Sequence, residues 1–171
     1  DLHSFPTRRS SDLQVDLATP DGATPLYIAA QEGHLETVQY LVGQGAKVDL
    51  ATQNGTTPLM IAAQNGQLET VQYLVEHQAT VNQATQEGLT PLYVAASKGH
   101  LATVQCLVAH GAQVDLARND GVTPLYIAAF QGQLETVQYL VEHQAAVNQA
   151  TQEGLTPLYV AASKGHLATR S

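Results

Sequence analysis

The sequence has no tryptophan, two phenylalanines, one methionine and one cysteine among its 171 residues. With so few of these side chains, a buried interior has to be built from leucine, valine, isoleucine and alanine. The single cysteine, Cys106, excludes a disulfide within the chain and favours a reducing compartment. No run approaches the roughly 18 apolar residues of a membrane-spanning helix. We therefore predict an intracellular, cytoplasmic protein without a membrane partner.

Basic residues are also scarce. The formal net charge is −8, and between Gln14 and Thr169 four basic residues stand against thirteen acidic ones, which gives −9. Binding to nucleic acid or to an anionic membrane requires clustered cations. The composition therefore argues against both as partners.

One short phrase recurs at a fixed interval. Thr-Pro-Leu, followed by tyrosine or methionine, occurs five times at a spacing of 33 residues, beginning at Thr24, Thr57, Thr90, Thr123 and Thr156. A strict period of this length is typical of a stacked array whose units cannot bury their apolar faces alone. Threonine is a good N-cap, and proline fits the first helical position because its missing N–H would be unpaired there. Each phrase therefore predicts the start of a helix.

The unit from Asp49 to Val81 illustrates the rest of the repeat. Its polar loop ends in Asn54-Gly55, a pair that favours a tight reversal. A first helix is predicted from about Pro58 to Gln64, and a second from about Leu68 to His77, where apolar residues fall on one face. Helices this short are marginal in isolation, so neighbouring units must hold them.

The complete unit resembles the ankyrin repeat. The pattern is Gly-x-Thr-Pro-Leu-x-x-Ala-Ala-x-x-Gly-His, then Val-x-x-Leu-Val, then Gly-Ala-x-Val-Asp. The first unit carries it at Gly22, Thr24, Pro25, Leu26, Ala29, Ala30, Gly33, His34, Val38, Leu41, Val42, Gly45, Ala46, Val48 and Asp49. The resemblance implies an all-α solenoid of helix–turn–helix units with β-hairpin-like loops. We assign the array to residues 14–169, with repeats 16–48, 49–81, 82–114, 115–147 and 148–169, the last truncated.

The two ends do not fit this pattern. Residues 1–13 resemble the translation of a common short-read sequencing adapter, and all thirteen residues match. The alternative is a basic, serine-rich targeting arm carried by Arg8 and Arg9. Arg170-Ser171 also interrupts the repeat and resembles the start of a reverse adapter. We therefore expect residues 14–169 to be an internal piece of a longer array, framed by sequence that is not native.

Several positions depart from the family pattern. Tyrosine or methionine replaces the histidine that usually follows Thr-Pro-Leu, and threonine or Arg118 replaces an aspartate of the loop. Gln78 and Gln144 replace glycine after the second helix, and a left-handed conformation there would cost each roughly 1 kcal/mol relative to glycine. Residues 67–103 also recur as 133–169 with a single change, so the array is built in blocks of two repeats.

The chemically reactive side chains have structural explanations. His77, His110 and His143 recur at one position, but adjacent helices pack about 8–10 Å apart and zinc ligands lie about 2 Å from the metal. A cation at a helix C-terminus explains this file of histidines better than a metal site. Cys106 replaces a tyrosine and is expected to fill space rather than act as a nucleophile. With no phosphate-binding loop or paired catalytic carboxylates, we predict no enzymatic activity, metal or cofactor.

The remaining prediction is a binding surface. The ankyrin resemblance implies that a protein partner docks in a concave groove formed by the hairpin tips and the inner helices. Phe130, the only phenylalanine of the repeats, is either a hot spot there or packs partly against the next helix. The predicted partner-binding residues are Gln53, Asn54, Thr56, Gln86, Glu87, Leu89, Lys98, Asn119, Asp120, Val122, Phe130 and Gln131.

Two other functions stay open. Ankyrin arrays often serve as the targeting region of a larger enzyme or channel. The array also resembles a substrate of asparaginyl hydroxylases, because a leucine lies eight residues before both Asn82 and Asn148. Neither asparagine has the acid commonly found two residues before such a site.

Overall fold

The computed structural model describes residues 14–165. The adapter-like segment 1–13, His166 and Arg170-Ser171 lie outside the described residues. In the part described, the chain forms nine helices and no strand. None of these helices has the length and apolar character needed to cross a membrane.

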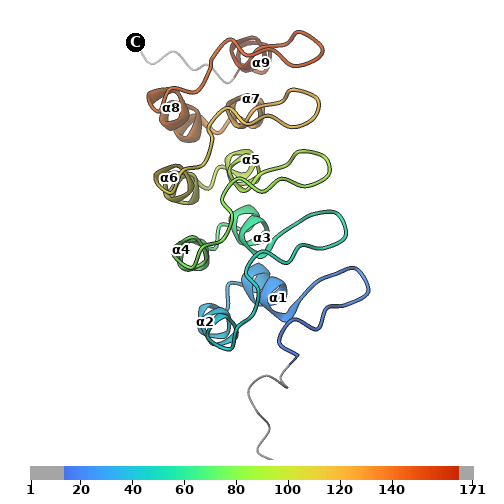
Figure 1. Ribbon diagram of the computed structural model, residues 1–171. Coiled ribbons are helices and arrows are strands. Elements are labelled where there is room, and N and C mark those ends of the chain that lie inside the picture. The colour runs from blue at the N-terminus through green and yellow to red at the C-terminus, as the bar shows by residue number, and fades with distance from the viewer. Residues whose placement is uncertain (1–13, 166–171) are drawn as a thin grey trace, which may run out of the picture.

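The helices form two parallel rows, with one loop per unit projecting from one side (Figure 1). The row beside the loops, called the inner row here, contains α1 (Pro25–Glu32), α3 (Pro58–Gln64), α5 (Pro91–Lys98), α7 (Pro124–Gln131) and α9 (Pro157–Ser163). The outer row contains α2 (Leu35–Gly43), α4 (Leu68–Glu76), α6 (Leu101–Ala109) and α8 (Leu134–Glu142). The inner helices α1, α3, α5 and α7 each contact the next inner helix and the outer helix of their own unit. The arrangement is the predicted helix–turn–helix solenoid.

The Thr-Pro-Leu phrase starts every inner helix as predicted. In α3, the Thr57 hydroxyl accepts a hydrogen bond from the Met60 N–H at 3.2 Å, and Pro58 is the first helical residue. The same bond is present in the other four units at 3.1–3.2 Å. An N-cap of this kind contributes about 1 kcal/mol, which is substantial for helices of seven or eight residues.

The core is a column of aliphatic side chains between the two rows. The leucine of each Thr-Pro-Leu phrase is at most 2% exposed in the first four units, at Leu26, Leu59, Leu92 and Leu125. Small alanines on the same helices, such as Ala63 and Ala96, are fully buried and allow the rows to approach closely. Burying one such leucine stabilises the fold by roughly 2 kcal/mol. The stacking of units therefore supplies the stability that no single unit has.

Consecutive units are also joined by the acid or amide that opens each repeat. The Asp49 carboxylate accepts the N–H of Thr80 at 2.9 Å. Asn82 occupies the equivalent place and accepts the Gln113 N–H at 2.9 Å. Aspartate and asparagine can alternate there because both supply an acceptor oxygen at the same point.

Gln78 and Gln144 adopt the left-handed conformation, with φ of 69° and 67°. The equivalent glycines, Gly45 and Gly111, have φ of 89° and 88°, and a Cβ atom placed on either would meet nothing within 4 Å. A side chain at this position is therefore strained but not blocked. This explains how glutamine replaces glycine there at a cost of about 1 kcal/mol.

Candidate functional site

The loop tips are joined into a continuous ladder. A tip here means the two residues before each loop glycine: Pro20-Asp21, Gln53-Asn54, Gln86-Glu87, Asn119-Asp120 and Gln152-Glu153. The first tip residue donates its backbone N–H to the carbonyl of the second residue of the preceding tip, at 2.9–3.3 Å over four steps. Its side-chain amide donates to the carbonyl of the first residue of that tip, at 2.6–2.9 Å. Each tip is therefore held to the one before it by two hydrogen bonds.

Within each loop, threonine performs the task that aspartate usually has in the family pattern. The Thr52 hydroxyl accepts the Thr56 N–H at 3.2 Å, and Thr85 accepts the Leu89 N–H at 3.1 Å. In the fourth loop Arg118 stands at this position. Its guanidinium forms a two-point ion pair with the Asp120 carboxylate, and Asp120 also accepts the Val122 N–H at 3.2 Å. The pairing raises the pKa of Arg118 and lowers the pKa of Asp120, so both are charged at neutral pH.

The predicted partner-binding residues fall into two groups. The tip residues and the ends of the inner helices are mostly exposed; these are Gln53, Asn54, Gln86, Glu87, Lys98, Asn119, Phe130 and Gln131. Asp120 and Thr56 are half-buried. Leu89 and Val122 are also half-buried and pack against the core. The structure thus gives these two residues a packing role that the sequence pattern did not indicate.

Phe130 lies at the end of α7 with 37% of its surface exposed. The ammonium group of Lys164, in the following unit, lies 4.6 Å from the centre of the ring. A cation over an aromatic face at this distance contributes about 0.5–1 kcal/mol at an exposed site. The ring is therefore partly covered and partly presented to solvent, and its role in partner binding stays a prediction.

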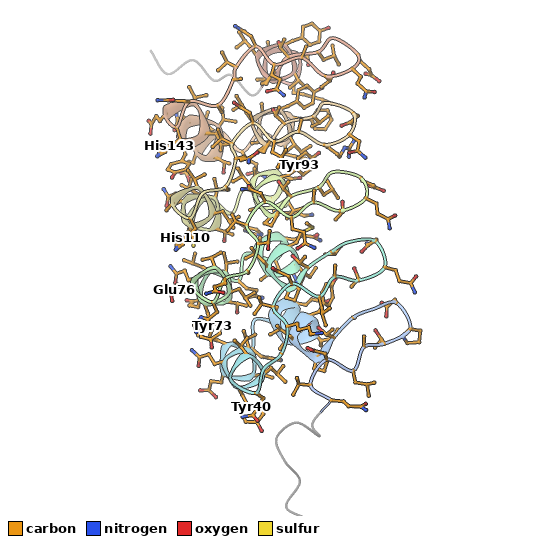
Figure 2. The ribbon with its side chains drawn as sticks, viewed as in Figure 1. Tyr40, Tyr73, Glu76, Tyr93, His110 and His143 are labelled. Atoms are coloured by element: carbon orange, nitrogen blue, oxygen red, sulfur yellow. The ribbon has the colours of Figure 1, made fainter. Side chains whose placement is uncertain are left out.

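The tyrosines of the inner helices lie behind the tips. Burial raises the pKa of the Tyr27, Tyr93 and Tyr126 phenols, and neighbouring tip carboxylates raise it further for Tyr27 and Tyr126. Tyr93 is labelled on the inner row in Figure 2. All three phenols are therefore neutral at physiological pH and can both donate and accept hydrogen bonds.

The family model described as "Ankyrin repeats (3 copies)" matches the chain over residues 9–85, 81–151 and 114–170. The chain belongs to the ankyrin-repeat family. A comparison with curated proteins finds no match. Ankyrin repeats are generally non-catalytic modules for protein–protein interaction.

The outer row of the ankyrin array carries the file of histidines, of which His110 and His143 are labelled in Figure 2. His77, His110 and His143 each place Nδ1 2.8 Å from the carbonyl oxygen four residues earlier. His77 also stacks on Tyr73 and His143 on Tyr139, with ring centres 3.8 and 3.9 Å apart. The predicted structural role at the helix C-terminus is therefore visible as a direct hydrogen bond. Residues 14–165 contain no group of three potential metal ligands from His, Cys, Asp and Glu.

Cys106 is a buried, free cysteine of α6. Its sulfur lies 3.8 Å from His110 Nδ1, but that nitrogen is also 2.8 Å from the Cys106 carbonyl. Burial raises the pKa of the thiol, and nearby Glu76 raises it further. A thiolate is therefore disfavoured, and this environment suits a packing residue rather than a nucleophile.

Asn82 and Asn148 differ in their surroundings. Asn82 donates from Nδ2 to the Gly111 carbonyl at 3.0 Å and accepts the Gln113 N–H through Oδ1. Asn148 is exposed. An enzyme acting on Asn82 would have to break the joint between two repeats, while Asn148 is accessible without that step. Hydroxylation of either residue stays a prediction.

Proposed function

We propose that the chain is a non-catalytic scaffold that binds a protein partner along its inner surface. The inner surface comprises the five tips together with the last turns of the inner helices. The hydrogen-bonded tip ladder carries this proposal, because it fixes five loops in one register without using the side chains of the second tip residues. A partner would therefore meet a preorganised row of side chains, which reduces the ordering cost of binding.

The other surfaces of the array offer less to a partner. The outer helices use their histidines in hydrogen bonds to their own carbonyls. The inner surface combines exposed polar tips with the ring of Phe130, the type of aromatic side chain that often dominates binding energy. Service as the targeting region of a larger enzyme or channel remains compatible with this proposal, because targeting uses the same kind of surface.

Cross-linking can locate the surface that a partner uses. A photo-reactive amino acid replaces Glu87, on a tip, or Glu76, on the outer helix α4; both glutamates are exposed. We expect a partner to cross-link from position 87 and not from position 76, and then to bind the purified array with a measurable Kd. Equal labelling from the two positions, or labelling from position 76 alone, would contradict binding at the inner surface.

Phe130 provides the quantitative test. We expect Phe130→Ala to weaken binding of that partner at least about tenfold while lowering Tm by less than about 2 °C, because the ring is partly exposed at the end of a helix. Tyr40→Ala is the matched control, since Tyr40 is an exposed aromatic residue of the outer row (Figure 2). It should leave binding unchanged. A loss of Tm without a loss of binding in Phe130→Ala would place Phe130 in the core.

A further inference from the structure

Small recesses lie between successive tips, and two of them are lined by a tyrosine of the inner row. The first, about 290 Å³, is bordered by Asp21 and Asn54 and has Tyr27 at its base. Another, about 150 Å³, is bordered by Asp120 and Glu153 and has Tyr126 at its base. A water molecule occupies about 30 Å³ in the liquid, so each recess has room for the end of a long side chain.

In the sequence, a unit that has an acidic second tip residue also has a tyrosine after its Thr-Pro-Leu phrase. A carboxylate lies six residues before the tyrosine in four units: Asp21 with Tyr27, Glu87 with Tyr93, Asp120 with Tyr126 and Glu153 with Tyr159. In the second unit both are replaced, by Asn54 and Met60. The fold does not require this pairing, since the second unit has the same loop and the same N-cap bond. Their joint occurrence therefore indicates a function that uses the carboxylate and the phenol together.

One residue of this chain, Arg118, already lies among the tip carboxylates and indicates that an arginine side chain suits them. Arg118 stands where the first recess has Thr52 and the second has Thr151. Its guanidinium pairs with Asp120, and the charge of Glu87 raises the pKa of Arg118 further. One arginine of the array thus occupies the tyrosine–carboxylate environment between the third and fourth tips.

We propose that the recesses at Tyr27 and Tyr126 each bind an arginine side chain from a basic, extended segment of a protein partner. This inference rests on the proposed function, because it specifies what the inner surface recognises. The carboxylate of Asp21 at the first recess, and of Glu153 at the second, pairs with the guanidinium, and the phenol oxygen accepts one of its N–H groups. A recess of about 260 Å³ also remains between the third and fourth tips, but Glu87, Arg118, Asn119 and Asp120 line it and Tyr93 does not. Because Arg118 is already paired with Asp120 there, we expect no arginine of a partner to reach Tyr93.

Charge favours a basic partner over a second copy of this chain. The repeats carry four basic residues against thirteen acidic ones, so two arrays would repel each other at their tips. The two tyrosine-lined recesses, at Tyr27 and Tyr126, are three repeats apart. This separation is roughly 30 Å if each repeat advances about 8–10 Å. An extended chain covers about 3.3 Å per residue, so arginines separated by about nine residues could reach both.

The probe is a synthetic peptide with two arginines separated by about nine glycine and serine residues, and the protein is the full chain with isotope-labelled tyrosine rings. We expect the ring signals of Tyr27 and Tyr126 to shift and to saturate at about millimolar peptide or below. The Tyr93 signals should not move. Matched peptides with two lysines or two glutamines should bind more weakly, the glutamine peptide without measurable shifts.

Variants of the recess sharpen the test. Arg118→Thr restores the residue found at this position in the other four units, and we expect the Tyr93 signals to respond to the arginine peptide in this variant. Asp21→Asn and Glu153→Gln should each raise Kd about fivefold at the nearer recess. Glu76→Gln is the control, because it removes an exposed carboxylate of the outer helix α4 that borders neither recess; it should leave the Tyr27 and Tyr126 responses unchanged. Unchanged circular dichroism confirms that each variant is folded.

Three results would overturn the proposal: no tyrosine response to the arginine peptide, equal responses to the arginine and glutamine peptides, or an equal response of Tyr93 in the wild-type chain. Binding of the lysine peptide as tightly as the arginine peptide would overturn the assignment to guanidinium. These failures are distinct from failure of the proposed function. A partner that cross-links from position 87 but ignores the recess variants would leave the scaffold in place and remove only the arginine sites.

Discussion

The third and fifth units have the same sequence over their loops and inner helices, yet they differ in burial. Leu92 is 1% exposed and its copy Leu158 is 58% exposed; Tyr93 and Tyr159 are 6% and 61% exposed. Since local sequence is identical, the difference comes entirely from neighbours. Within residues 14–165, α5 packs between the inner helices α3 and α7, whereas α9 has an inner-row neighbour, α7, on one side. Burial in this array is therefore a property of position in the stack, not of the unit.

The largest expected difference between the third and fifth units is in how often their helices open locally. We expect amide exchange to be slowest in repeats two to four and faster at both ends, with α9 exchanging at least about a hundredfold faster than α5. Hydrogen exchange followed by mass spectrometry resolves the two helices. Uniform protection along the whole chain would contradict this.

The next largest difference should come from truncating the two equivalent leucines, Leu92 and Leu158, and comparing the losses in unfolding free energy. Leu92→Ala should lower the free energy of unfolding by about 3 kcal/mol, because it leaves a cavity in a packed column. Leu158→Ala should cost less than about 1 kcal/mol, since that side chain is already largely solvated. Urea unfolding of the full chain measures both, and equal losses would show that burial does not govern the contribution.

The loop glycines give a smaller contrast. Gly88 and Gly154 have φ of 84° and 79°, so alanine is strained at both. A Cβ atom on Gly88 would also lie 2.8 Å from the Asn119 backbone nitrogen, whereas nothing lies within 4 Å at Gly154. We expect Gly88→Ala to cost about 2–3 kcal/mol and Gly154→Ala about 1 kcal/mol in unfolding free energy. Thermal and urea unfolding of the pair would reveal any reversal of that order.

The smallest expected effect is a gain in stability. Gln78→Gly relieves a left-handed glutamine and should stabilise the chain by about 1 kcal/mol. Gly111→Gln is the reciprocal change at the equivalent place one repeat later, where the space is open, and should destabilise by a similar amount. If both substitutions changed Tm in the same direction, the left-handed conformation would not explain them.

Local features of the fold followed well from the sequence. The predicted helix from Pro58 to Gln64 is confirmed, and the second helix ends at Glu76 with His77 as its cap residue. Such features depend on contacts within four residues: a threonine cap, a proline at the first helical position, or a glycine reversal. The array as a whole was predictable because its period and family motif agree five times.

Interactions between units were not predictable in the same way. The Gln86 side chain donates to the Gln53 carbonyl, 33 residues away, and neither residue type signals such a bond in sequence. The exposure of Phe130 likewise depends on Lys164, 34 residues later. Leu89 and Val122 were assigned to the binding surface by their place in the motif, and only packing shows that they also support the core. The missing information was the stacking geometry.

The tip ladder limits how many different partners such an array can distinguish. Gln53, Gln86, Asn119 and Gln152 each need an amide long enough to reach the tip before, so variation there is confined to two residue types. The second tip residue contributes only its backbone carbonyl to the ladder, so aspartate, asparagine and glutamate all occur there, although the Asn54 and Asp120 side chains also bond within their own loops. Under the proposed function, each added repeat contributes about one further variable position at its tip, and diversity in recognition grows by lengthening the array rather than by elaborating one loop.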